Sequence, residues 1–159
     1  AKREVYATSG PRIGLRFGLN QDDAELCNAE GWTPRATMGE VTHITSKPTF
    51  TIQVQADITP LTSIEIVKLT YTDEQAHEEV IPLWHKPKGA ALACIQWTDE
   101  QFDSASATLW YPRVKEHPTP RWSAAQCAAV NRCDEFPQMD ATLQERAWGS
   151  PIWHVPATE

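Results

Sequence analysis

The sequence predicts an all-β fold, a sandwich of antiparallel sheets with a few short peripheral helices. In its clearest segment, 49–58, apolar residues alternate with polar ones. A period of two is typical of a strand that buries one face. About six or seven short segments of this kind follow one another with turn signals between them, which favours a sandwich over a doubly wound sheet.

The strands can be placed in chain order. Alternation over 12–18 predicts an early strand. Residues 63–71 continue the pattern after 49–58, but the apolar positions change phase between Ile66 and Val67, which suggests a bulge. A polar turn over 71–76 then predicts a hairpin to 78–84.

Pro82 in the second arm of this hairpin lacks a backbone N–H, so that strand is expected at a sheet edge. Two further strands, 90–97 and 106–114, are predicted on either side of a polar loop. Together these segments account for most of the chain.

Helices are predicted only as short pieces. Residues 21–29 can form one, with two aspartates at its N-terminal end. Ser123 and Gln126 have the spacing of a capping box and predict a helix that ends at Asn131. A last helical turn or two is expected over 142–147.

Composition indicates one water-soluble domain over residues 1–159, without internal repeats. No apolar run approaches the roughly 20 residues that a membrane-spanning helix needs. The net charge of −7, with Lys and Arg scattered singly, disfavours nucleic acid as a partner. We interpret the seven Trp residues as packing side chains, and the alternative is that some of them form a sugar-binding platform.

Cys27, Cys94, Cys127 and Cys133 allow three disulfide connectivities. The preferred pairing joins Cys127 to Cys133 and Cys27 to Cys94. Two such bonds would predict a periplasmic or secreted protein, because disulfides persist in oxidising compartments. Four buried free thiols in a cytoplasmic protein remain the alternative.

No catalytic constellation is visible in the sequence. The five histidines form neither a His-x-His nor a His-Glu-x-x-His motif, so we predict no metal ligands and no cofactor in this chain. Residues 99–103 group oxygen ligands but lack the spacing and glycine of an EF-hand. No nucleophile elbow is present either, and we predict no catalytic residue.

Several motifs together resemble the C-terminal part of a large bacterial family of unknown function. They are the opening Tyr6-Ala-Thr-Ser-Gly-Pro-Arg-Ile13, Met38-Gly39, Ile64–Lys68, the turn Pro118–Ser123 and the closing Gln144–Trp153. The family tends to have Met-Gly-Gly where this chain has Met38-Gly39-Glu40. Its N-terminal part is grouped with metal-dependent hydrolases of the polymerase-and-histidinol-phosphatase (PHP) type.

This resemblance implies that residues 1–12 join an upstream barrel domain, which holds the metal ligands and is the expected partner. Arg12, Arg121 and Trp122 lie inside the motifs and are the candidate substrate or domain contacts. The expected function is that of a non-catalytic C-terminal domain that packs against, or completes, the active site of that hydrolase. The alternative is a secreted carbohydrate- or peptide-binding module that uses exposed Trp residues.

Overall fold

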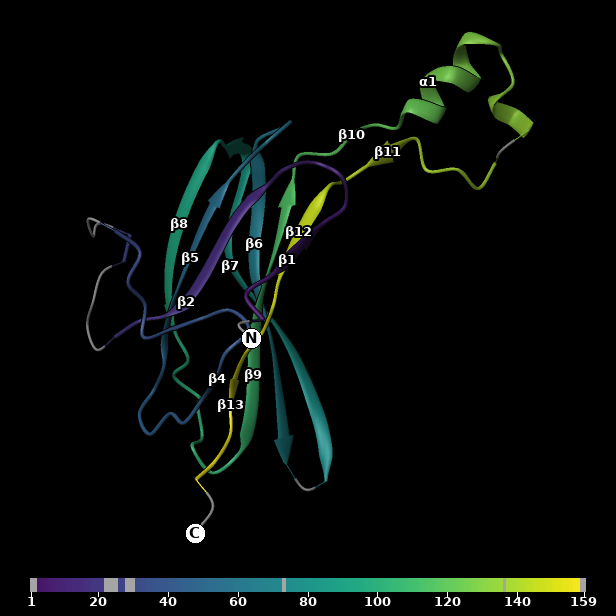
Figure 1. Cartoon of the computed structure of the whole chain (residues 1–159). Helices are drawn as coiled ribbons and strands as arrows, with labels where there is room; N and C mark the ends of the chain where they lie inside the picture. Colours follow the sequence, from purple (N-terminus) through teal and green to yellow (C-terminus); the bar gives the residue numbers. More distant parts are fainter. Residues whose placement is uncertain (1–2, 22–25, 28–30, 73, 136, 158–159) are drawn as a thin grey trace.

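Two β-sheets packed face to face make up the body of the protein, with a helical arm that projects from one end (Figure 1). The computed structural model describes residues 3–21, 26–27, 31–72, 74–135 and 137–157. Strands dominate this part of the chain, and the predicted all-β, sandwich-like fold is confirmed.

The elements follow one another along the chain, and their bounds fix the labels used below. The strands are β1 (Tyr6–Thr8), β2 (Gly14–Leu19), β3 (Ala36–Thr37), β4 (Val41–Thr42), β5 (Thr49–Gln55), β6 (Leu61–Thr72), β7 (Gln75–Ala90), β8 (Leu92–Thr98), β9 (Ala107–Glu116), β10 (Thr119–Pro120), β11 (Thr142–Leu143), β12 (Arg146–Gly149) and β13 (Ile152–His154). The helices are α1 (Trp122–Ala129) and the short 3₁₀ helix η1 (Cys133–Glu135).

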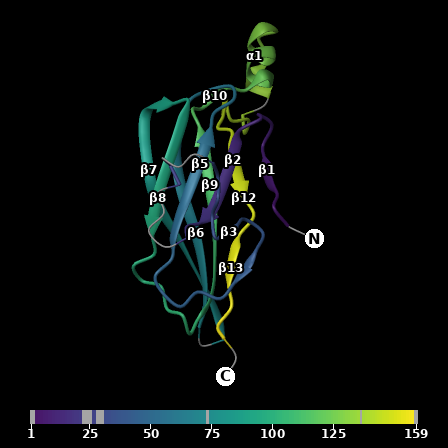
Figure 2. The same ribbon diagram turned by 60° about the vertical axis from the view of Figure 1, so that its left-hand side comes forward.

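The larger sheet is built around β9. On one side β9 pairs with β6, which pairs with β7. On the other side β9 pairs first with β13 and then with β12, and these two are flanked by β4 and β1. The smaller sheet has the order β3-β2-β5-β8 and covers one face of the larger sheet (Figure 2).

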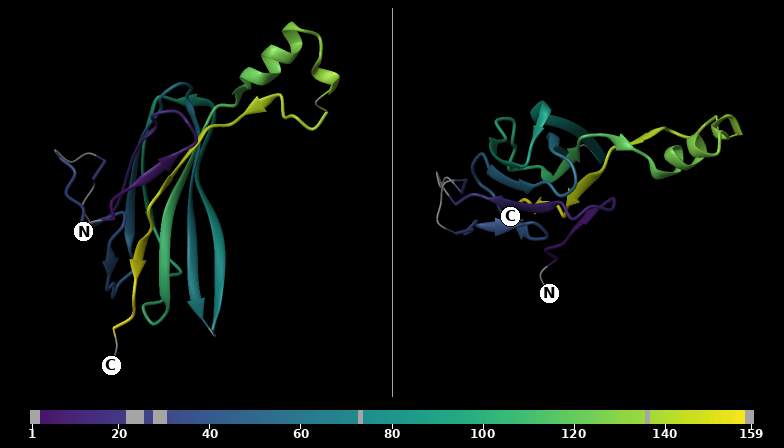
Figure 3. Two further views of the ribbon diagram at one scale, coloured as in Figure 1. Left: turned by 45° about the vertical axis from the view of Figure 1, so that its right-hand side comes forward. Right: turned by 90° about the horizontal axis from the view of Figure 1, so that it is seen from above.

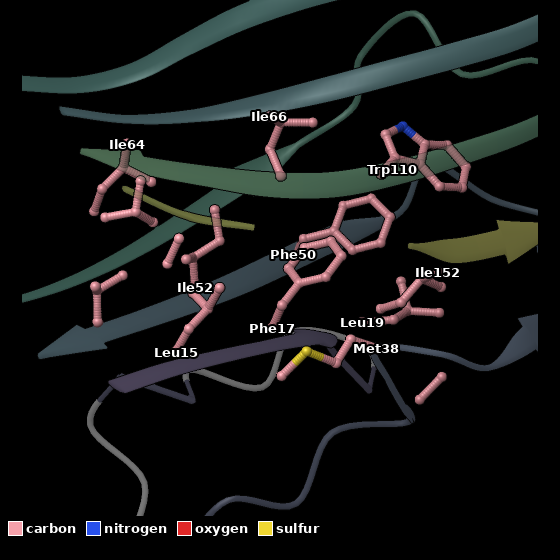
Figure 4. Close-up of a cluster of buried hydrophobic side chains, with 14 of the residues drawn as sticks. Leu15, Phe17, Leu19, Met38, Phe50, Ile52, Ile64, Ile66, Trp110 and Ile152 are labelled. Carbon is pink, nitrogen blue, oxygen red and sulfur yellow. The ribbon is translucent and has the colours of Figure 1, made fainter. Parts of the chain in front are cut away.

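The core fills the space between the two sheets. Figure 4 shows Phe17 and Phe50 of the smaller sheet beside Trp110 of the larger one. The ring centroids of Phe50 and Trp110 are 5.0 Å apart, and all three side chains are at most 1% exposed. The alternating residues of β2, β5, β6 and β9 therefore supply the buried face that their pattern predicts.

The irregularity in β6 lies elsewhere than the sequence suggests. Register shifts occur near Leu61 and between Ile64 and Glu65, whereas Ile66 and Val67 pair regularly with β9. Both Ile66 and Val67 are fully buried. The change of phase at this point reflects burial of both faces of the strand, which removes the alternation without a bulge.

The edge position of β7 is confirmed, because among the described strands it pairs only with β6. The helix expected over 142–147 is wrong: β11 and the start of β12 occupy this stretch, since strand pairing with β10 and β9 outweighs local helix propensity. Most of the helix predicted over 21–29 lies outside the described residues.

The arm comprises residues 119–143, with β10 and β11 at its base and α1 and η1 beyond them. Figures 1 and 3 show α1 standing away from both sheets. Arg121 is the N-cap of α1, without a side-chain hydrogen bond, so the predicted cap at Ser123 is wrong. Asn131 adopts a left-handed conformation just beyond the helix, as a helix end permits.

Two disulfides are present, Cys27–Cys94 and Cys127–Cys133, the pairs preferred from the sequence. The first ties the segment after β2 to β8, and the second closes a short loop inside the arm. In the described part of the chain, no helix has the length and apolar character that crossing a membrane requires.

Candidate functional site

The opening and closing motifs lie side by side as β1 and β12, close to the base of the arm. Ser9 extends this pairing: its backbone N–H donates to the carbonyl of Arg146 at 3.0 Å, and its hydroxyl accepts from Arg146 N–H at 2.9 Å. The same hydroxyl donates to the carboxylate of Glu145. The 8–12 turn is therefore held in place by the closing motif.

The Met38-Gly39 element secures the N-terminal segment. Met38 is 4% exposed and belongs to the core, while Gly39 donates its N–H to the carbonyl of Pro151 at 2.9 Å. A Cβ added at Gly39 would lie 2.2 Å from the carbonyl oxygen of Arg3, and the φ of +93° is one that other residues rarely adopt. The close approach of the backbone at Arg3 therefore explains why position 39 is a glycine, and no ligand contact is needed to explain it.

Gly39→Ala is therefore expected to destabilise the protein by about 1–3 kcal/mol, through strain at a positive φ and displacement of the segment around Arg3. Urea unfolding of the two proteins measures the difference. Gly31→Ala is the matched control, because Gly31 also has a positive φ, of +101°, but, its chain neighbours aside, no atom of the described residues lies within 4 Å of its added Cβ. Equal losses in the two variants would show that the close approach contributes nothing.

Arg12 lies on the sandwich and not on the arm. Its side chain is exposed, and its backbone N–H donates to the carboxylate of Asp57 at 2.6 Å. The backbone N–H of Asp57 donates in turn to Glu116 at 2.8 Å, and Glu116 is fully buried. The buried carboxylate therefore organises the loop that positions Arg12.

Arg121 and Trp122 begin the helix of the arm. The Arg121 backbone N–H donates to the carbonyl of Ala141 at 2.9 Å, which joins the two sides of the arm base. Its Nε is buried without a hydrogen-bond partner among the described residues. Trp122 is 73% exposed. Within the described part of the chain, no hydrogen bond, ion pair or ring contact joins Arg12 to either residue.

The arm carries a hollow of about 570 Å³ with a largely apolar lining. Trp122, Val130 and Met139 contribute apolar surface, and Arg132 lies at the same hollow. Val130 is 63% exposed. The sequence pointed to Trp122 through its motif, but Val130 and Met139 were missed because their grouping depends on the fold of the arm beyond α1.

A second feature is an ion-pair network on the outer face of the larger sheet. The carboxylate of Glu65 binds Arg113 Nε, and Lys115 Nζ lies 3.2 Å from it. Burial raises the pKa of Glu65, but the hydrogen bonds and charges of Arg113 and Lys115 outweigh it and hold that pKa below 4.5. The stability that this shift contributes is complete above the unfolded-state value and is lost as the pH falls through the lower folded-state value.

The polar residues of the 99–103 loop serve the fold. Asp99 is buried and accepts from Lys68 Nζ at 2.6 Å and from the indole N–H of Trp110 at 3.0 Å. Asp103 accepts from the Ala105 N–H at 3.0 Å. These contacts occupy the carboxylates of Asp99 and Asp103.

His154 is also bound within the fold. Its Nδ1 accepts from the backbone N–H of Ile44 at 3.0 Å, and its Nε2 lies 3.0 Å from the carbonyl of Ser104. Both ring nitrogens of this buried side chain therefore have partners inside the fold. Among the residues that the structure describes, no three His, Cys, Asp or Glu side chains are grouped so that they could hold a metal ion.

The sequence and the fold of this chain can be compared with those of known proteins. No curated protein and no solved structure matches the chain. The family model described as "Protein of unknown function (DUF3604)" matches residues 1–85 and 82–156. Because these matches together span nearly the whole sequence, the chain belongs to the DUF3604 family.

Proposed function

We propose that this chain is a non-catalytic β-sandwich domain that packs against a PHP-type catalytic domain and completes or shields its active site. The observation that carries the proposal is Trp122, a large apolar side chain that is 73% exposed on an arm standing away from the sandwich. Exposed apolar surface that is gathered on one element commonly marks a protein contact.

The arm has little core of its own, which supports a docking role. Its helix has eight residues, and of these only Cys127 is buried. A helix of this length is marginal in water and depends on packing for most of its stability. The Cys127–Cys133 bond restrains the arm, while Trp122 and Val130 still face solvent. A partner that fills the hollow between them would supply the missing packing.

The proposed setting is the periplasm or the exterior of the cell. Its support is the pair of disulfides, because such bonds form and persist in oxidising compartments. The metal of the catalytic domain belongs to residues outside this chain, and the resemblance of the opening and closing motifs is the basis for naming the PHP type.

The alternative of a sugar- or peptide-binding module requires several Trp faces that share one accessible groove. Among the described residues, Trp122 is the Trp with a largely exposed ring. The rings of Trp148 and Trp153 lie on the sheet, and each has an arginine guanidinium above it, Arg146 and Arg3 respectively. A multi-Trp platform therefore has no support in the exposed rings.

Trp122→Ser and Val130→Ser test the docking role. In the isolated chain both variants are expected to keep the free energy of unfolding of the parent, within about 0.5 kcal/mol, because the side chains are exposed. In the complete gene product the same changes are expected to make residues 119–143 at least several-fold more sensitive to limited proteolysis, since the docked arm loses its anchors.

The matched control is Tyr71→Ser, which removes an aromatic ring that is 55% exposed on the sandwich. It is expected to leave the cleavage of the arm unchanged. If Trp122→Ser and Val130→Ser do not accelerate cleavage in the complete gene product, the arm is not the docking element and the proposal fails.

A further inference from the structure

The outer face of the larger sheet carries three cations at neighbouring positions. Arg113 and Lys115 are two residues apart on β9, so their side chains leave the same face about 7 Å apart. Arg146 of β12 lies directly opposite Lys115 in the strand register. We call Arg113, Lys115 and Arg146 the cationic patch.

In the described part of the chain, one carboxylate forms ion pairs with this patch. Glu65 of β6 lies opposite Arg113, and it binds both Arg113 and Lys115. Arg146 has no carboxylate partner in the part of the chain that the structure describes, and its Nε donates to the carbonyl of Gln144 at 3.4 Å. Three cations and one carboxylate leave a net charge of about +2 here, on a chain whose net charge is −7.

Farther along the same face, Arg3 above Trp153 and Glu78 on β7 offset each other in charge. The hydrogen bond that Arg113 donates to Glu65 is the main cause of the raised pKa of Arg113, and the charge of Glu78 adds to it. The excess of positive charge is therefore concentrated at the end of β9 that adjoins the arm.

The pairing of Lys115 with Arg146 is unfavourable for the fold. Side chains directly opposite each other on antiparallel strands have Cβ atoms about 5 Å apart, and like charges in that position destabilise the sheet. The juxtaposition of Lys115 with Arg146 therefore adds no stability, and what Lys115 contributes to the fold comes from its ion pair with Glu65. Sites that break a local rule of stability are commonly functional.

The surroundings of the patch indicate the kind of ligand. A hollow of about 380 Å³ adjoins Lys115 and is also lined by Ser63, His85 and Gln144, all of which can donate hydrogen bonds. Along the face, the cross-strand neighbours Leu69, Leu109 and Trp153 form an apolar row. Arginine and aromatic side chains are enriched at protein contacts relative to the rest of the surface.

We propose that the cationic patch binds an acidic polypeptide segment whose carboxylates occupy the positions between Lys115 and Arg146 and whose apolar side chains cover the row of Leu69 and Leu109. An acidic polysaccharide fits less well, because the rings of Trp148 and Trp153 already have guanidinium groups above them and leave less free surface for sugar stacking. The site is separate from the arm and does not depend on the function proposed for it.

The test uses a glutamate–tyrosine copolymer as the probe, with poly-L-glutamate, polygalacturonate and inorganic phosphate as comparators. The copolymer is expected to bind best, with an affinity that falls steeply as salt is added. Lys115→Gln and Arg146→Gln are each expected to weaken binding about fivefold, because each removes a charge that faces the ligand.

Arg16→Gln is the matched control, since Arg16 is an exposed cation on β2 in the other sheet. It is expected to leave the affinity unchanged. Urea unfolding of each patch variant checks that it keeps the fold, so that weaker copolymer binding reflects the lost charge and not a loss of structure.

Four results would overturn the proposal. They are the absence of copolymer binding, equal weakening by Arg16→Gln, binding of polygalacturonate or phosphate as tight as that of the copolymer, and a copolymer affinity in Lys115→Gln and Arg146→Gln equal to that of the parent. Tight polygalacturonate binding would assign the face to an acidic glycan.

Discussion

Replacing Asp99 by alanine is expected to lower the free energy of unfolding by about 3–5 kcal/mol, the largest loss that we predict for a single substitution. Asp99 and Lys68 form an ion pair with a distance of 2.6 Å, and their side chains are only 3% and 8% exposed. The alanine variant leaves the Lys68 ammonium and the Trp110 indole N–H without their acceptor inside the protein.

Urea unfolding of Asp99→Ala, Lys68→Met and the double variant measures this effect. The double variant is expected to lose less than the sum of the two single variants, because it no longer buries an unpaired charge. Lys47→Met is the matched control, since Lys47 pairs with Glu100 at the surface and is expected to lose less than about 1 kcal/mol. A loss from Asp99→Ala as small as that of Lys47→Met would contradict the structural role of this pair.

Removal of the Cys27–Cys94 disulfide is expected to cost about 4 kcal/mol, whereas removal of Cys127–Cys133 is expected to cost about 2 kcal/mol. The difference follows from the sequence separations, 67 residues for the first bond and 6 for the second, because a longer closed loop restricts the unfolded chain more. The second bond also lies in the arm, away from the sandwich core.

Paired Cys→Ser variants at each bond, unfolded in urea, measure the two costs. The Cys127–Cys133 variant serves as the control for the loss of a disulfide as such. The Cys27–Cys94 variant should show the larger loss, with cooperative unfolding of the sandwich at a lower midpoint. Equal costs, or a larger cost for the arm bond, would contradict the assignment of the long-range bond as the main covalent restraint on the sandwich.

The strands that the sequence predicted well are those with one buried face. Phe50, Ile52 and Val54 alternate with more polar positions because β5 lies inside the smaller sheet and faces the core on one side. At the centre of β6 the apolar and polar residues no longer alternate, because Ile66 and Val67 are buried on opposite faces of the strand. Alternation with a period of two reveals only strands that bury one face. Where both faces are buried the alternation is lost, and we therefore placed the expected bulge at the wrong residues.

The segment 142–147 was predicted as a helical turn because its residues favour helix locally. Its structure is set by partners that are distant in sequence: Leu143 pairs with Thr119, and Arg146 pairs with Lys115. The cationic patch was missed for the same reason. Lys115 and Arg146 are isolated charges in the sequence, and only the register of β9 and β12 brings them together.

The candidate contacts drawn from the motifs have different surroundings in the fold. Arg12 is on the sandwich near the buried Glu116, while Arg121 and Trp122 start the arm. The motif identified Trp122 as a position of interest, but its 73% exposure depends on the projection of the arm, which no local pattern reports. Docking through this residue remains a proposal that rests on its exposure.

The most direct test of the proposed docking is amide hydrogen exchange over residues 119–143, compared between the isolated chain and the complete gene product. In the isolated chain, α1 is expected to exchange rapidly, because an eight-residue helix with one buried residue opens readily. In the complete gene product, docking is expected to slow the exchange of the same amides by at least tenfold, while β5 and β9 exchange equally slowly in both. Identical exchange of the arm in the two proteins would contradict the docking role.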